Sequence, residues 1–277
     1  MKTTNRFFAA MAVMLLLFYA IETSAQEENE QMAPQFITVT TMHWNMDMED
    51  FDMDTWKSVE KEYLDKVTAK NDYIMSSSFY LHNLTPDNTE LIYVRAYGSW
   101  ADIEKASMRD SELEKEAWPD ETAREAFLKK QRSYYSHEHS DEIYATMPPL
   151  AKEMADWSKD MVCYIRKSHM AFPEDGKNDE LRTLYTEYVD KMIKANPLIK
   201  GYYPHRHAWG TDGTEMMEAL FVDSMADLEK MFDGMDALAK EAWPDETARK
   251  ERNKAMSKYF TGVHSDYVYS LVAGLGK

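Results

Sequence analysis

Two histidines separated by one residue, His205 and His207, have types and a spacing that could do chemistry. They fall in a segment that we expect to be a β-strand, where side chains two positions apart face the same way. Glu218, on the next expected strand, would add a carboxylate. Such a trio could bind a divalent metal, or one member could act as a general base. The pattern also suits polar residues on a half-exposed edge strand, so it does not by itself specify a metal site.

The neighbouring strands add an arginine and several tyrosines. In the segment 90–98, the apolar residues Ile92, Val94 and Ala96 are expected to face the helices, so Arg95 would face the opposite way. The same alternation in the second copy places Glu218 on the face away from the helices. The predicted catalytic residues are His82, His207, Arg95 and Glu218. A histidine or glutamate would be the general base, and Arg95 would stabilise an anion. The predicted ligand-binding residues are Tyr80, Tyr93, Tyr97, Tyr144, His205 and Tyr269. The tyrosines could equally fill a barrel as core.

Two further patterns do not support the chemistry that they suggest. The string "HSD" begins at His139 and again at His264, but adjacent strand residues point to opposite faces, so Ser140 is not aimed at His139. No nucleophile elbow accompanies it, which argues against a serine hydrolase. Cys163 is the only cysteine and lies in the apolar run "MVCYI", which is typical of a buried, unreactive thiol.

The string "KEAWPDETAR" occurs twice, and Lys115 recurs as Lys240, 125 positions later. Pro119 should end one helix and Asp120 should cap the next, with Trp118 as an apolar anchor. Arg124 lies about one turn from Asp120 and Glu121 and could pair with either. The alternative is that Trp118, Arg124 and their mates Trp243 and Arg249 line a ligand site. The same shift matches "EYLDKV" with "EYVDKM", "SWADIEK" with "SMADLEK" and His82 with His207, which indicates a tandem duplication.

Each copy predicts the same order of elements, β-α-β-β-α-β. In the first copy the expected strands are 36–44, 73–84, 90–98 and 139–147, and the expected helices are 54–70, 100–116 and 120–135. This order is the ferredoxin-like split βαβ unit, an antiparallel sheet with helices on one face. Its other face needs cover, and two such units in one chain can supply it to each other.

On this order and duplication the chain resembles the dimeric α/β-barrel superfamily in a fused tandem form, similar to the antibiotic-biosynthesis monooxygenases and the NIPSNAP-like proteins. The resemblance implies an α+β fold with two tandem ferredoxin-like βαββαβ units packed sheet to sheet as an intrachain pseudo-dimeric α/β barrel. We divide the chain into a signal peptide (1–25), a first unit (26–147), a linker (148–160) and a second unit (161–277).

The N-terminus and the composition bear on location and partners. Lys2 and Arg6 precede the apolar run 7–21, and "TSA" ends before Gln26, which together predict a cleaved secretory signal peptide. A membrane anchor is the alternative, but the run is short for a bilayer span. The formal charge of −17 disfavours nucleic acid as a partner. We therefore expect an exported, periplasmic or extracellular protein, a monomer or homodimer, with no membrane contact after cleavage.

Two functions fit these observations. The first is binding of a small organic molecule in a cavity between the two sheets, with cofactor-independent acid–base or monooxygenase-type chemistry. Haem, held by a barrel histidine, is a special case of it, but the sequence indicates neither haem nor a metal cofactor. The second is a non-catalytic structural or interaction module of the cell envelope. Whether the interior of the barrel is open or filled distinguishes the two.

Overall fold

A computed structural model describes residues 35–277, which form an α+β protein. The predicted signal peptide and residues 26–34 lie outside the described residues. No helix within 35–277 is both long and apolar enough to span a bilayer. We call residues 35–147 the first half and residues 161–277 the second half.

The first half follows the predicted order of elements. Its strands are β1 (Phe36–Trp44), β2 (Ser76–Leu84), β3 (Glu90–Tyr97) and β4 (Tyr135–Thr146). Its helices are α2 (Met53–Lys66), the 3-10 turn η1 (Thr68–Lys70), α3 (Trp100–Ala117) and α4 (Glu121–Ser133). Every predicted element is present, and β4 begins four residues before the predicted start at 139.

The second half repeats this order. Its strands are β5 (Met161–Met170), β6 (Gly201–Trp209), β7 (Glu215–Val222) and β8 (Phe260–Leu271). Its helices are α5 (Asn178–Tyr188), the π-helical segment η3 (Val189–Lys194), α6 (Met225–Ala242) and α7 (Glu246–Ser257). The strands of each half are ordered 4-1-3-2, as the split βαβ pattern requires.

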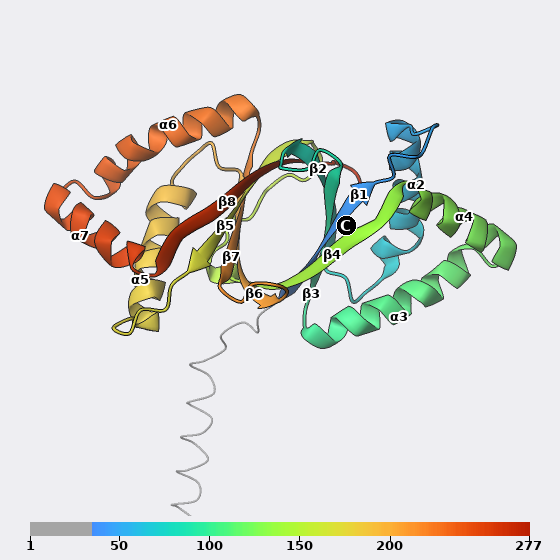
Figure 1. Cartoon of the computed structure of the whole chain (residues 1–277), viewed down its shortest axis with the longest axis horizontal. Coiled ribbons are helices and arrows are strands. Elements are labelled where there is room, and N and C mark those ends of the chain that lie inside the picture. The colour runs from blue at the N-terminus through green and yellow to red at the C-terminus, as the bar shows by residue number, and fades with distance from the viewer. Residues whose placement is uncertain (1–34) are drawn as a thin grey trace, which may run out of the picture. The chain divides into compact units, whose positions relative to one another are not determined.

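The eight strands close into one antiparallel barrel in the order β1-β3-β2-β8-β5-β7-β6-β4. The halves join at two places, where β2 pairs with β8 and β4 pairs with β6. Figure 1 shows the barrel in the centre, with α2, α3 and α4 on one side and α5, α6 and α7 on the other. Because all neighbours are antiparallel, β3 and β7 run in the same direction. The β2–β3 and β6–β7 hairpins therefore lie at the same end, which we call the hairpin end.

The opposite end is covered by the connection between the halves. After the 3-10 turn η2 (Pro148–Leu150), this segment runs without helix or strand, apart from one bridge at Lys152, to the start of β5. Met154 is buried in the barrel core, and its backbone N–H donates to the Tyr203 hydroxyl at 2.9 Å. The ring of Trp157 packs edge-on against Phe221, with centroids 5.6 Å apart. The predicted linker thus covers this end of the barrel.

The repeated string "KEAWPDETAR" forms a helix–break–helix joint, as predicted. Asp120 caps α4 by accepting from the Ala123 N–H at 2.8 Å, and Asp245 caps α7 in the same way. Trp118 is buried and stacks on Phe127, with ring centroids 4.1 Å apart. The predicted partner of the arginine is wrong: Arg124 donates to the Trp118 carbonyl at 3.1 Å, and Arg249 makes the same bond to Trp243. The arginine satisfies a carbonyl that the broken helix leaves without a partner.

Candidate functional site

The interior of the barrel is lined by a face of the strands that differs in part from the predicted one. Ile92, Val94 and Ala96 of β3 point inward and join one apolar cluster with Met217, Ala219 and Phe221 of β7. The predicted assignment of these sets to the helix side is wrong. Both faces of these strands are apolar, because one packs inside the barrel and the other packs under helices. Alternation alone therefore could not tell the two faces apart.

Four predicted site residues consequently lie outside the barrel, on the helix side. They are Tyr93, Arg95, Tyr97 and Glu218. The guanidinium of Arg95 pairs with Asp110 of α3 at 2.5 Å, beneath the helix. Glu218 accepts hydrogen bonds from the hydroxyls of Tyr185 and Tyr202, two buried residues of the second half. These groups therefore stabilise the contact between helices and sheet rather than facing a ligand in the barrel.

The three predicted metal ligands do not lie on the same face of the sheet. His205 and His207 point inward, whereas Glu218 points to the helices. Within residues 35–277 no three histidine, cysteine or acidic side chains are grouped so that they could hold a metal ion. The carboxylate that was expected to complete the trio belongs to a different network.

The tenth predicted residue, His82, is the cross-strand neighbour of Tyr269, and its ring lies 2.8 Å from the Thr85 hydroxyl. The other five predicted residues point into the barrel, and most of them are deeply buried. Tyr80, Tyr144 and Tyr269 are 7%, 0% and 5% exposed and belong to the interior cluster. His205 is also buried, and burial lowers its pKa to about 4, so its ring is neutral at physiological pH. The ring of His207 lies 6.5 Å from that of Tyr144, between centroids. With Phe221 and Met161 also buried there, the middle of the barrel is filled with large side chains.

A charged cluster lies above this apolar packing, at the hairpin end. We call it the lysine cluster, and it consists of Glu142 (β4), Tyr144 (β4), Lys167 (β5) and Glu215 (β7). The Lys167 ammonium lies 2.8 Å from a Glu142 oxygen, 3.1 Å from a Glu215 oxygen and 3.0 Å from the Tyr144 hydroxyl. The Tyr144 hydroxyl donates to the carboxylates of Glu142 and Glu215. Two halves of the chain therefore share one cluster.

The protonation states in this cluster follow from its contacts. Burial opposes the charge on Lys167, but the carboxylates of Glu142 and Glu215 outweigh it and raise the pKa of Lys167. Burial would raise the pKa of Glu142, but the ammonium of Lys167 outweighs it and lowers that pKa. Burial and the Glu215 carboxylate raise the pKa of Tyr144. At neutral pH Lys167 is therefore a cation, Glu142 a carboxylate and Tyr144 a neutral phenol, which can stabilise charge, accept a proton and donate a hydrogen bond.

The equivalent positions of the other half form a second version of the cluster at the same end. We call it the threonine cluster, and it consists of Thr41 (β1), Glu90 (β3), Tyr267 (β8) and Tyr269 (β8). The Tyr269 hydroxyl donates to Glu90, as Tyr144 does to Glu215. Thr41 stands where the second half has Lys167, since Thr41 pairs with Ile92 and Ser140, and Lys167 pairs with Met217 and Ser265. Tyr267 stands where the first half has Glu142.

The repeat offset changes within these clusters, from 125 residues in β3 and β7 to 126 in β1 and β5. His43 lies opposite Glu90, and His169 lies opposite Glu215, which fixes the difference. Both histidines lie beside a hairpin aspartate, His43 at 3.4 Å from Asp87 and His169 at 3.0 Å from Asp212. The shift of 125 residues found in the sequence therefore does not extend to the first strand, and the difference of one residue hides the match between Thr41 and Lys167.

Sequence reasoning missed Glu90, Glu142, Lys167 and Glu215. Glu90 and Glu215 could have been found, because they match at an offset of 125 and both begin a strand after a hairpin turn. Lys167 could not, because it follows another long basic residue, Arg166, and only the register of β5 decides which of the two faces inward.

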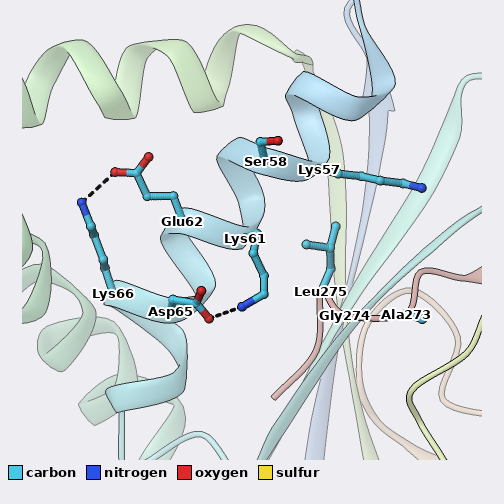
Figure 2. A pocket seen from close by; sticks show the side chains of 9 residues that line it. All are labelled: Lys57, Ser58, Lys61, Glu62, Asp65, Lys66, Ala273, Gly274 and Leu275. Carbon is cyan, nitrogen blue, oxygen red and sulfur yellow. Dashed lines mark hydrogen bonds and ion pairs between the residues drawn. The ribbon is translucent and has the colours of Figure 1, made fainter.

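Two pockets lie outside the barrel. A groove of about 650 Å³ runs between α2 and residues 273–275, as Figure 2 shows. Its charges largely neutralise one another within one helix, because Lys61 pairs with Asp65, and Lys66 with Glu62 at 2.7 Å. A pocket of about 280 Å³ lies between the loop after β1 and the β2–β3 hairpin, near Trp44 and Thr89. Neither pocket includes a residue of the two clusters.

No protein-family model and no curated protein matches the chain. Solved structures do resemble it. A candidate monooxygenase from Fusobacterium nucleatum matches with a TM-score of 0.52 and 9% identity, over 87% of this chain and 94% of the other. An anthrone oxidase-like protein matches with a TM-score of 0.51 and 12% identity, over 89% and 94%. A variant of chlorite dismutase from Candidatus Nitrospira defluvii matches with a TM-score of 0.51 and 9% identity, over 87% and 92%. The chain therefore shares the ferredoxin-like, dimeric α/β-barrel fold of these structures.

Proposed function

We propose that the protein binds a small polar organic molecule at the hairpin end of its barrel and places acid–base groups against it. The lysine cluster is the observation that carries this proposal. Charged side chains that face a barrel interior cost desolvation free energy, so their retention on the inner face suits a role that uses the charge. The filled middle of the barrel limits the ligand to the hairpin end.

The residues of the lysine cluster would divide the chemistry among them. A carboxylate of Glu142 or Glu215 would accept a proton from an acidic C–H or O–H group of the ligand. The ammonium of Lys167 would stabilise the resulting anion, and the Tyr144 hydroxyl would donate a hydrogen bond to it. His207, beside Tyr144, would exchange protons with solvent. Fold similarity to candidate monooxygenases and an anthrone oxidase-like protein supports a small organic ligand.

The barrel would be a fused pair of units that descend from a tandem duplication. The recurrence of "KEAWPDETAR" and the 4-1-3-2 strand order of both halves support this history. We further propose export, on the N-terminal pattern of basic residues, apolar run and small residues. N-terminal sequencing of the processed protein, with a start near Gln26, tests export. Retention of residues 1–25 would contradict it.

Retention of ligand from a metabolite extract tests the proposed function. The purified protein is incubated with the extract, washed, and the retained molecules are identified by mass spectrometry. The proposal expects a molecule that wild-type protein retains and that Lys167→Met loses at least about tenfold. Lys57→Met is the matched control, because it removes the same charge in the groove outside the barrel. Equal retention by the two variants, or none by wild type, would contradict the proposal. The absorption spectrum of the same sample tests haem.

The filled middle of the barrel favours a second candidate, a non-catalytic module of the cell envelope. Tyr80, Phe221 and Met161 are buried there, as a purely structural core would require. In that case the lysine cluster would only tie the two halves together. Loss of stability in Lys167→Met without any ligand retained by wild-type protein would support this second function.

A further inference from the structure

We propose that the threonine cluster binds a primary ammonium group of a small molecule, at the place that corresponds to the Lys167 ammonium in the other half. This inference rests on the proposed function, because it assigns the ligand class of the same hairpin end. The two equivalent positions are Thr41 and Lys167.

The first observation is the conserved part of the two clusters. In each cluster, a tyrosine of the last strand of one half donates to the glutamate that begins the strand after the hairpin of the other half. Tyr144 of β4 donates to Glu215 of β7, and Tyr269 of β8 donates to Glu90 of β3. Tyr144 and Tyr269 are both buried. The two glutamates therefore have the same donor, in the same orientation, at the same end of the barrel.

The two clusters differ in the charged partner of the glutamate. Glu215 has the Lys167 ammonium at 3.1 Å, whereas Glu90 has no lysine or arginine partner within residues 35–277. The nearby His43 pairs with Asp87 instead. A partly buried carboxylate is stabilised by a counter-charge, and no lysine or arginine of residues 35–277 supplies one to Glu90. A formal charge of −17 would also raise the local concentration of small cations.

The third observation is the chemistry of the surrounding groups. Tyr267 replaces Glu142, and its ring lies 6.4 Å from that of Tyr269, nearly parallel to it. Two tyrosine rings beside one carboxylate are a favourable setting for an organic ammonium group, through charge and cation–π attraction. In the lysine cluster the Lys167 ammonium lies 5.6 Å from the Tyr144 ring centroid.

The two clusters would then act on one ligand. The threonine cluster would hold its ammonium group, and the lysine cluster would face the part that exchanges a proton. The chemical class is a small primary amine with a second polar group.

The test uses n-butylamine, which is the side chain of lysine as a separate molecule, and n-butanol as its neutral counterpart. Binding is followed by NMR in protein with labelled isoleucine and methionine methyl groups. The methyl group of Ile92, opposite Thr41, reports on the threonine cluster, and that of Met217, opposite Lys167, reports on the lysine cluster. In wild-type protein, n-butylamine should shift the Ile92 signal at a concentration at least about tenfold below that needed with n-butanol.

Three variants sharpen the test. Thr41→Lys supplies the internal ammonium and should abolish the Ile92 response to n-butylamine. Thr40→Lys adds the same charge on the outer face of the same strand and should leave the response intact. Lys167→Thr should create a second amine site, so that Met217 now responds. Circular dichroism spectra that match wild type show that each variant is folded.

The outcomes separate the inference from the function that it rests on. If n-butanol shifts Ile92 as strongly as n-butylamine, or if Thr41→Lys responds like wild type, the ammonium site is overturned while ligand binding at the hairpin end survives. If neither compound shifts a hairpin-end methyl group and no metabolite is retained, both proposals fail.

Discussion

The hydroxyl of Tyr144 on β4 donates to the carboxylate of Glu215 on β7, and the two residues belong to different halves of the chain. Tyr269 and Glu90 make the reciprocal bond. Each cluster at the hairpin end is therefore assembled only when the barrel closes. The stability of the barrel and the construction of the site depend on the same contacts.

Replacement of Tyr144 by phenylalanine should destabilise the barrel more than replacement of Tyr269. The Tyr144 hydroxyl contacts Glu142, Glu215 and Lys167, whereas one hydrogen bond, to Glu90, is recorded for that of Tyr269. We expect Tyr144→Phe to lower the free energy of unfolding by about 1–3 kcal/mol, and Tyr269→Phe by less. Urea denaturation measures both. Equal losses would mean that the lysine cluster adds nothing to the shared tyrosine–glutamate bond.

Lys167→Met should destabilise the protein most near neutral pH. It leaves the carboxylates of Glu142 and Glu215 close together without their cation, at a cost of about 1–3 kcal/mol for these partly exposed groups. The loss should shrink below about pH 4.5, where carboxylates become protonated. Thermal unfolding from pH 4 to pH 8 gives the profile. A loss that does not change with pH would point to packing rather than charge.

The wild-type cluster should itself make stability depend on pH at both extremes. The pKa of Glu142 is lowered in the folded state, so its contribution is present above the unfolded pKa and is lost as pH falls through the folded value. The pKa of Lys167 is raised, so its contribution is present below the unfolded pKa and is lost as pH rises through the folded value. In the double variant Glu142→Gln/Lys167→Met, the free energy of unfolding should depend less on pH at both low and high pH than in wild type. Urea denaturation at a series of pH values measures this.

His205 should contribute to acid unfolding. Its folded pKa of about 4 lies below that of an exposed histidine, so the unfolded state binds the proton more readily and stability falls as pH drops from about 6.5 towards 4. NMR titration should show no protonation of His205 above pH 5, and His205→Phe should reduce the pH dependence of the melting temperature in this range. A titration midpoint near 6.5 would contradict the burial of this ring.

Glu60 should have the opposite effect to Glu142. It is buried in the first half, and burial raises its pKa despite hydrogen bonds from Tyr135 and Gln131. Since its folded pKa is raised, folding is penalised as pH rises above the unfolded value. The stability of Glu60→Gln relative to wild type should therefore rise from pH 5 to pH 8, measured by urea denaturation. A relative stability that falls from pH 5 to pH 8 would contradict the raised pKa of Glu60.

The order of elements, the joint at "KEAWPDETAR" and the inward position of Tyr80, Tyr144 and Tyr269 could be predicted from sequence. Turn residues, caps and apolar periods are local signals, and each of them occurs twice because the sequence repeats. The inward face of β3 and β7 could not be predicted. In "MMEALFV" both faces are apolar, and the one carboxylate, Glu218, accepts hydrogen bonds from two buried tyrosines of other elements.

The clusters themselves needed the three-dimensional register. Lys167 contacts residues of β4 and β7, and neither contact can be recognised from the sequence around Lys167. The slip of one residue between β1 and β5 also hides the correspondence of Thr41 with Lys167. Long-range pairing across a closed barrel is the information that one sequence lacks.

The reciprocal tyrosine–glutamate bonds have a consequence for how such a site can diversify. In a barrel made from two identical chains, one codon change alters both clusters, so a lysine in one requires a lysine in the other. In a barrel made from one chain this constraint is absent, because positions 41 and 167 are encoded separately. A threonine and a lysine can then face the same ligand from opposite sides and recognise a molecule whose two ends differ.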